Sequence, residues 1–82
     1  MEKYPVTRQL NAVGFLCPLP VLKARKLLAQ MGQGEILEVT ATDIASWKDM
    51  PAFCKAAGHT LVSATNKDGL LTYVIRCKVS NR

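Results

Sequence analysis

The chain of 82 residues lacks a long apolar run and an even set of cysteines. Its longest uncharged stretch, residues 9–22, has 14 residues, fewer than the roughly 20 that a membrane helix needs. The first residues mix acidic and basic side chains and precede no small-residue cleavage site, so we predict no targeting segment. Three cysteines in so short a chain do not suggest a disulfide framework. We therefore expect a cytoplasmic protein without a membrane partner.

The sequence also has little material for a metal site or a general base. Its one histidine, His59, could pair with a cysteine, but a surface or strand-edge histidine is the commoner outcome. Cys17, Cys54 and Cys77 are 37 and 23 residues apart, without the short Cys-x-x-Cys spacing of a zinc site. Glycine-rich phosphate loops are also absent. We expect no metal and no cofactor.

The composition is that of one small globular domain, residues 1–82, because 49% of the residues are hydrophobic and 21% are charged. The net charge of +5 fits an acidic partner, RNA or simply a solvated surface. Basic residues are spread along the chain, and no aromatic-rich strand is present on which bases would stack. We therefore do not expect direct nucleic-acid binding.

Apolar periodicity predicts the element order βαβαββ. Strands are expected at residues 8–13, 35–41, 60–65 and 70–79, and helices at residues 18–31 and from Ser46 or Asp49 to residue 57. The first strand, helix and second strand would form a parallel unit, and Asp68-Gly69 marks a hairpin turn. The fold class is thus an α/β (α+β) two-layer sandwich, with a four-stranded mixed sheet and two helices on one face. Its core spans about residues 8–79.

The same periodicity predicts which side chains form the core. In the first helix these are Val21, Ala24, Leu27, Leu28 and Met31. In the second helix they are Trp47, Met50, Cys54 and Ala57, and in the last strand Leu71, Tyr73, Ile75, Cys77 and Val79. Cys54 and Cys77 are therefore interpreted as packing residues rather than as chemical groups.

Cys17 differs from the other two cysteines because Pro18 and Pro20 follow it closely, at the point where a strand passes into a helix. Gly14 ends the strand, and Pro18 fits the first helical position, so Cys17 is expected to cap the helix. Unpaired N–H groups and partial positive charge at a helix N-terminus should lower the pKa of the thiol. The alternative is a buried cysteine that happens to precede a helix. We interpret Cys17 as an accessible nucleophile.

The first helix also offers a candidate docking surface. Leu19 and Leu22 fall opposite the predicted core face, with Lys23 and Lys26 beside them. Single exposed leucines are ordinary and need no explanation. Two of them inside a basic patch, one turn from a reactive thiol, suggest that this face binds an acidic-rimmed partner protein.

The segment from Gly14 to Pro20, with Cys17, Pro18 and Pro20 followed by a basic helix, resembles the Cys-Pro-x-Pro signature of the TusA/SirA/YedF sulfur-carrier family. The resemblance continues at residues 34–39, at Asp43, and at residues 49–54, 58–61 and 73–76, and it covers about residues 8–79. It implies a sulfurtransferase that carries sulfane sulfur as a persulfide on Cys17. The sulfur would come from a cysteine desulfurase or rhodanese-type donor and pass to an acceptor protein. Relatives serve tRNA thiolation, molybdenum-cofactor enzymes or sulfur oxidation.

Two other functions remain open from the residues alone. A non-catalytic regulatory or RNA-binding module with the same fold would use the basic charge and would not need Cys17. A thiol redox protein would form a disulfide between Cys17 and another cysteine, which the predicted core positions of Cys54 and Cys77 oppose. Persulfide exchange needs only a thiolate and an open approach, so a carrier without its own general base is favoured.

Overall fold

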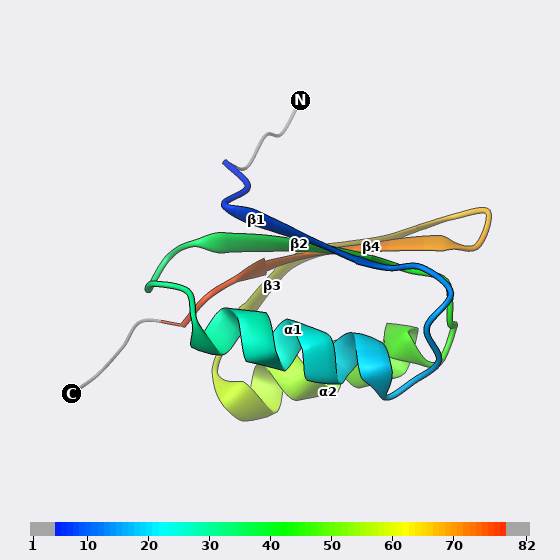
Figure 1. The fold of residues 1–82 in the computed structure, drawn as a ribbon, viewed down its shortest axis with the longest axis horizontal. Helices are drawn as coiled ribbons and strands as arrows, with labels where there is room; N and C mark the ends of the chain where they lie inside the picture. The colour runs from blue at the N-terminus through cyan, green and yellow to red at the C-terminus, as the bar shows by residue number, and fades with distance from the viewer. Residues whose placement is uncertain (1–4, 79–82) are drawn as a thin grey trace.

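The computed structural model describes residues 5–78, which form a sheet covered on one face by two helices (Figure 1). The strands are β1 (Arg8–Ala12), β2 (Ile36–Ala41), β3 (Thr60–Lys67) and β4 (Leu70–Arg76), and the helices are α1 (Leu19–Ala29) and α2 (Ser46–Ala57). The predicted βαβαββ order and the two-layer arrangement are confirmed. No helix in residues 5–78 is long and apolar enough to cross a membrane.

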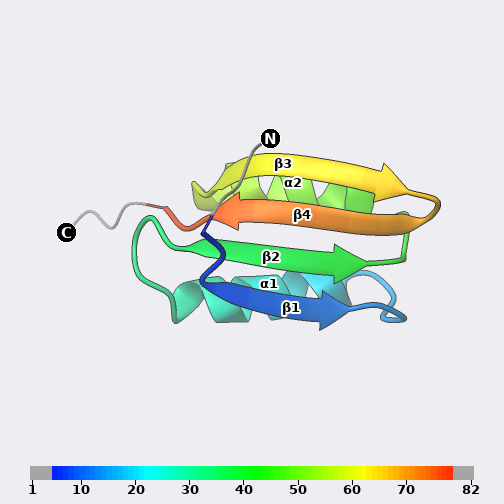
Figure 2. The ribbon, with the colours of Figure 1, turned by 90° about the horizontal axis from the view of Figure 1, so that it is seen from above.

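The sheet order is β1-β2-β4-β3, so the last strand lies between the second and the third. β1 runs parallel to β2, whereas β4 is antiparallel to both β2 and β3. Figure 2 shows α1 beneath the half of the sheet formed by β1 and β2, and α2 beneath the half formed by β4 and β3. Because each helix follows a parallel strand, both helices begin at the same end of the molecule.

Strict alternation in the two central strands produces the core. Leu37, Val39 and Ala41 of β2 are fully buried, as are Leu71, Tyr73 and Ile75 of β4. The helices complete this core with Ala24 and Leu28 from α1 and with Met50 and Cys54 from α2. Three further predicted residues of the first helix are partly buried against the core: Val21, Leu27 and Met31.

Two predictions about core residues need comment. Trp47 was expected in the core but is 41% exposed, because it lies in the first turn of α2 at the edge of the layer. Its ring only borders the core, with its centroid 6.3 Å from that of Tyr73. Cys77 is buried as predicted, although it lies just beyond β4, where its N–H still bonds to the carbonyl of Glu35. Val79 lies outside the described residues.

Element ends differ from the predictions at several points. α1 begins at Leu19 and ends at Ala29, so Pro18 is its N-cap and not its first helical residue. The N–H of Leu19 bonds to the carbonyl of Leu16, which makes a tight turn through the Cys17–Pro18 cis peptide. The strand before it ends at Ala12. α2 begins at Ser46 and tolerates Pro51 inside, at the loss of one backbone hydrogen bond.

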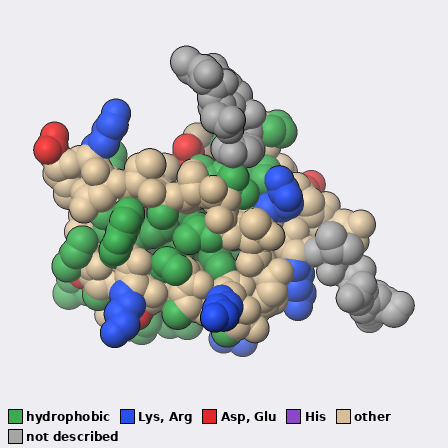
Figure 3. Space-filling view, turned by 180° about the vertical axis from the view of Figure 1, so that it is seen from behind, with side chains coloured by type: hydrophobic (Ala, Val, Ile, Leu, Met, Phe, Trp, Pro, Cys, Tyr) green, Lys and Arg blue, Asp and Glu red, His purple; other side chains and the backbone are tan. Residues whose placement is uncertain are grey.

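Apolar side chains also gather where α2 meets the edge strand β3, as the view from behind shows (Figure 3). Phe53 of α2 and Leu61 and Ala64 of β3 pack there against the core while remaining partly open to solvent. These three side chains cover the core at the β3 edge of the sheet.

The two leucines of α1 on opposite faces provide a test of the core. Leu28 is 2% exposed and Leu22 is 48% exposed. We expect Leu28→Ala to lower the free energy of unfolding by about 2–5 kcal/mol, because it leaves a cavity against the sheet. Leu22→Ala should change it by less than about 1 kcal/mol. Urea unfolding followed by circular dichroism measures both, and equal effects would contradict this assignment of the helix faces.

Candidate functional site

Cys17 lies in the loop of residues 13–18, between β1 and α1. This loop sits at the carboxyl ends of β1 and β2, at the right of Figure 1, beside the loop of residues 42–45 that leads into α2. The carboxyl ends of parallel strands are where open α/β sheets usually place their sites, because the connecting loops meet there. Cys17 is partly buried, and its neighbours Pro18 and Leu16 are exposed.

Side chains of the second loop hold the first loop in place. The Asp43 carboxylate accepts hydrogen bonds from the backbone N–H groups of Cys17 and Ala45. Thr42 Oγ1 accepts the N–H of Gly14 at 3.0 Å. The two N–H donors lower the pKa of the Asp43 carboxyl, that of Cys17 contributing most. Gly14 has a φ of +88°, which explains a glycine there although its Cβ position is open.

The core supports Asp43 in turn. Ser46 Oγ lies 2.8 Å from the carbonyl oxygen of Asp43 and 2.6 Å from the hydroxyl of Tyr73. Both Ser46 and Tyr73 are fully buried. A continuous hydrogen-bonded path therefore runs from the centre of β4 through the start of α2 to the backbone of Cys17.

The thiol itself contacts a second carboxylate. Cys17 Sγ donates to Asp49 Oδ2 at 2.6 Å, and Asp49 lies in the first turn of α2. This hydrogen bond, followed by desolvation and by the negative charges of Asp49 and Asp43, raises the pKa of the Cys17 thiol to about 11. The prediction that the helix N-terminus lowers the pKa of this thiol is therefore wrong.

The physical reason is that α1 offers the thiol few free donors. Pro18 and Pro20 have no N–H, and the N–H of Leu19 is bonded to Leu16. The N–H of Cys17 itself is taken by Asp43. The charges that act on the sulfur are therefore two carboxylates of the neighbouring loop and helix.

Exposed apolar side chains lie in the two loops at this end of the sheet and in the first turns of the helices that follow them. Val13, Leu16 and Leu19 lie on the side of the first loop and α1, and Ile44 and Trp47 lie on the side of the second loop and α2. Leu16 is 70% exposed and Ile44 63%, which is unusual for side chains of this size. We call these five residues the apolar collar.

The structure places the predicted docking residues on the open face of α1, where Leu19 belongs to both the collar and this set. Leu19 is 44% exposed and Leu22 is 48% exposed. Lys23 and Lys26 are also exposed, and the Lys23 ammonium lies 5.0 Å from the centre of the Phe15 ring. The four residues therefore form a continuous apolar and basic surface beside Cys17.

Sequence reasoning missed the roles of Asp43 and Asp49, and also Ile44 and Trp47. These residues are 26 to 32 positions from Cys17, and no local pattern links them to it. The available signal was topological. Two helices that follow neighbouring parallel strands begin at the same end of the sheet, so acidic residues at the start of α2 lie near the start of α1.

The other chemical side chains lie elsewhere. His59 follows the C-terminal end of α2, about 15 Å along the helix from Asp49, and its Nδ1 accepts the N–H of Lys78 at 3.0 Å. His59 therefore does not pair with Cys17. Cys54 and Cys77 are buried, and all three cysteines are free. No cluster of three or more candidate metal ligands occurs in residues 5–78.

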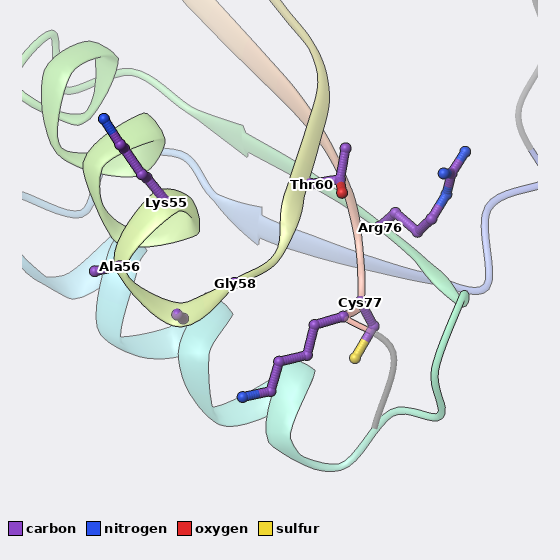
Figure 4. Close-up of a pocket in the computed structure, with 8 residues that line it drawn as sticks. Lys55, Ala56, Gly58, Thr60, Arg76 and Cys77 are labelled. Atoms are coloured by element: carbon purple, nitrogen blue, oxygen red, sulfur yellow. The ribbon is translucent and has the colours of Figure 1, made fainter. Parts of the chain in front are cut away.

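A basic hollow lies at this opposite end of the molecule, where α2 ends and β4 leaves the sheet (Figure 4). It is lined by Lys55, Ala56, Ala57, Gly58, Thr60, Arg76, Cys77 and Lys78. In Figure 4 the side chains of Lys55 and Arg76 point in different directions. Their charges do not converge on one bound group, so the collar around Cys17 remains the candidate site.

A small α/β domain that presents one cysteine on a surface loop is suited to carrying a group between partner proteins. This chain belongs to the family of the sulfurtransferase TusA, whose model matches residues 8–77. It is 48% identical over 69 residues to a putative sulfur carrier protein of Neisseria meningitidis, which covers 84% of this chain and 93% of that one. It is 41% identical to the sulfur carrier protein TusA of Allochromatium vinosum, over 84% of this chain and 91% of that one.

A solved structure supports the fold. The crystal structure of a SirA-like protein from Desulfitobacterium hafniense superposes with a TM-score of 0.79 at 26% identity, over 88% of this chain and 99% of that chain. The family resemblance derived from the Cys-Pro-x-Pro segment is thus confirmed, and the protein is a member of a sulfur-carrier family.

The bond between Asp43 and the N–H of Cys17 predicts a pH effect on the loop. The pKa of Asp43 is lowered by folding, so its contribution is present above the usual pKa of about 4 and is lost as the pH falls through the lower folded value. Hydrogen exchange by NMR should show a protected Cys17 amide at neutral pH, and the protection factor should fall upon acidification below that value.

The variant Asp43→Ala should remove this protection at every pH, while the amide of Val39 in the middle of β2 stays protected. A Cys17 amide that exchanges equally in the variant and the wild type would show that Asp43 does not hold the loop.

Proposed function

We propose that Cys17 is the residue on which this family member carries sulfur, accepting sulfane sulfur as a persulfide and relaying it to an acceptor protein. The observation that supports this is the difference between the three cysteines. Cys54 and Cys77 are 2% and 5% exposed and lie in the core, whereas Cys17 lies on an exposed loop at the edge of the sheet. An incoming donor therefore has one thiol to reach.

The reaction is an exchange between sulfur atoms. The Cys17 thiol gives up its proton, and its thiolate attacks the terminal sulfur of a donor persulfide. An S–S bond forms at Cys17 Sγ, the S–S bond of the donor breaks, and the donor leaves as a thiolate that takes up a proton. No electrons are gained or lost overall. In the second transfer an acceptor thiolate attacks the outer sulfur of the loaded carrier. The S–S bond at Cys17 then breaks, and Cys17 leaves as a thiolate that takes up a proton.

The docking surface, formed by Leu19, Leu22, Lys23 and Lys26, is proposed to bind the donor and then the acceptor. Its side chains are exposed on the same helix that begins two residues after Cys17. Apolar area gives affinity, while the lysines favour a partner with an acidic rim. The donor would be a cysteine desulfurase or a rhodanese-type protein.

The same chemistry favours a reducing compartment, so we propose a cytoplasmic location. A carrier thiol must return to its reduced state after each transfer, and all three cysteines of the chain are free. Nothing in the site favours direct contact with nucleic acid, because an apolar collar and two carboxylates surround the thiol.

Intact-mass spectrometry tests the carrier function. We expect one added sulfur after incubation with a cysteine desulfurase and cysteine, or with a rhodanese and thiosulfate. The addition should be removed by a thiol reductant and should be absent in Cys17→Ser, which keeps the size of the side chain but has no thiol. Cys54→Ser is a less suitable control for the loss of a thiol, because Cys54 is buried in the core and its substitution also changes the packing there.

Loading of the Cys17→Ser variant to the level of the wild type would place the sulfur elsewhere. Absence of loading from both donors, with Cys17 shown to be reduced, would argue against the proposal and for a binding module of the same fold. That module predicts full function of Cys17→Ser and partner binding that weakens steeply with salt.

Leu22→Glu tests the docking surface. The change places a negative charge in the centre of the surface, so transfer from the donor protein should slow at least tenfold while the thermal stability stays near that of the wild type. The matched control is Leu70→Glu, since Leu70 is 43% exposed and begins β4 on the other half of the sheet. Equal transfer rates for the two variants and the wild type would show that α1 does not bind the donor.

A further inference from the structure

The contact between Cys17 and Asp49 is an unexpected feature of a site that must attack sulfur. A nucleophilic cysteine usually lies beside a lysine, an arginine or a protonated histidine, which favour the thiolate. Here the hydrogen on Sγ is donated to a carboxylate oxygen. A neutral thiol can make this bond, whereas a thiolate at the same distance would repel the carboxylate.

The other groups near the thiol act in the same direction. Asp43 adds a second negative charge from the loop of residues 42–45, and desolvation of the sulfur also raises the pKa of the thiol. In the part of the chain that the structure describes, no lysine, arginine or histidine pairs with Asp49. Lys23 of α1 has its ammonium over the ring of Phe15, 5.0 Å from the ring centroid.

We propose that Asp49 is a positioning residue that holds Cys17 as a neutral thiol in the free carrier, and that a sulfur donor must displace this carboxylate before transfer. The proposal rests on the function of Cys17 proposed above. Its consequence for the partner is chemical: the donor must bring a cationic or hydrogen-bonding group to Asp49 as it docks, in addition to its own sulfur.

The magnitude of the effect explains why displacement is required. With a pKa of about 11, roughly one Cys17 side chain in ten thousand is ionised at neutral pH. An ordinary cysteine is ionised to a few per cent. The free carrier is therefore slow toward any electrophile that does not also engage Asp49, including oxidants and small disulfides.

The loaded carrier differs from the empty one at the same bond. Once a second sulfur is attached, Sγ has no hydrogen and cannot donate to Asp49. The carboxylate must then accept from the outer S–H or turn toward solvent. Asp49 thus distinguishes the two states of Cys17, and an acceptor meets a different local charge arrangement from the one that a donor meets.

The pH dependence of alkylation by iodoacetamide tests the proposal. Rates at Cys17 are measured by peptide mass from about pH 7 to about pH 12, a range that passes the pKa of about 11, with Cys17→Ser as the blank. In Asp49→Asn the midpoint should fall by at least about one pH unit, and alkylation at about pH 8 should be at least tenfold faster. The rate above the midpoint should stay unchanged, because the accessibility of the sulfur is the same.

Asp68→Asn is the matched control, because it removes one negative charge from the β3–β4 turn. Asp68 has a φ of +51°, a conformation that asparagine adopts readily. Its profile should coincide with that of the wild type. Coinciding profiles for Asp49→Asn and the wild type would overturn the proposal, as would a change in the plateau rate without a change in the midpoint.

The wild type alone provides a second test if Asp49→Asn fails to fold. The proposal requires a midpoint for Cys17 clearly above the ordinary value of about 8.5, and a midpoint at or below that value would refute it. Alkylation does not involve sulfur transfer, so the two proposals fail separately. A wild type that never accepts sulfur refutes the carrier function, whereas a normal loading rate with an ordinary midpoint refutes only the role of Asp49.

Discussion

The hydrogen bond from the Cys17 backbone to Asp43 is the interaction on which the site depends. It joins the loop that carries the thiol to the loop that begins α2, and Ser46 and Tyr73 anchor it to the core. Parallel pairing of β1 and β2 brings the two loops to one edge of the sheet. Without this hydrogen bond the loop of residues 13–18 would have one contact fewer with the rest of the domain, and the position of the sulfur relative to α2 would be less defined.

A sulfur carrier has to satisfy two opposing demands. Its thiol must be reachable by large partner proteins, and yet it must not react with every electrophile in the cell. This structure meets the first demand with an exposed loop inside an apolar collar and the second with two nearby carboxylates. With the roles proposed for Cys17 and Asp49, activation occurs in the complex and not in the free carrier, and selectivity lies in which proteins can cover the collar and engage Asp49.

Much of the fold could be predicted from the sequence because its signals are local. Alternation in β2 and β4, the Asp68-Gly69 turn and the apolar face of α1 each identify an element within a few residues. The start of α1 and the exposure of Trp47 were predicted wrongly, since both depend on how loops pack at the end of the sheet. The ionisation of Cys17 was also predicted wrongly. Its motif suggests a helix cap, but the groups that control it are Asp43 and Asp49, which only the tertiary fold brings near.

The long sequence separation of these contacts makes the chemical behaviour of Cys17 a property of the whole domain. Asp43 and Asp49 are 26 and 32 residues from the cysteine, so a short peptide with the Cys-Pro-Leu-Pro segment contains neither. In an unfolded or newly synthesised chain, the same residue is an ordinary thiol, and Cys54 and Cys77 are exposed beside it. The raised pKa of the Cys17 thiol is therefore acquired only when the domain has folded. Unfolded molecules would expose three ordinary thiols and would react faster with electrophiles than the folded carrier.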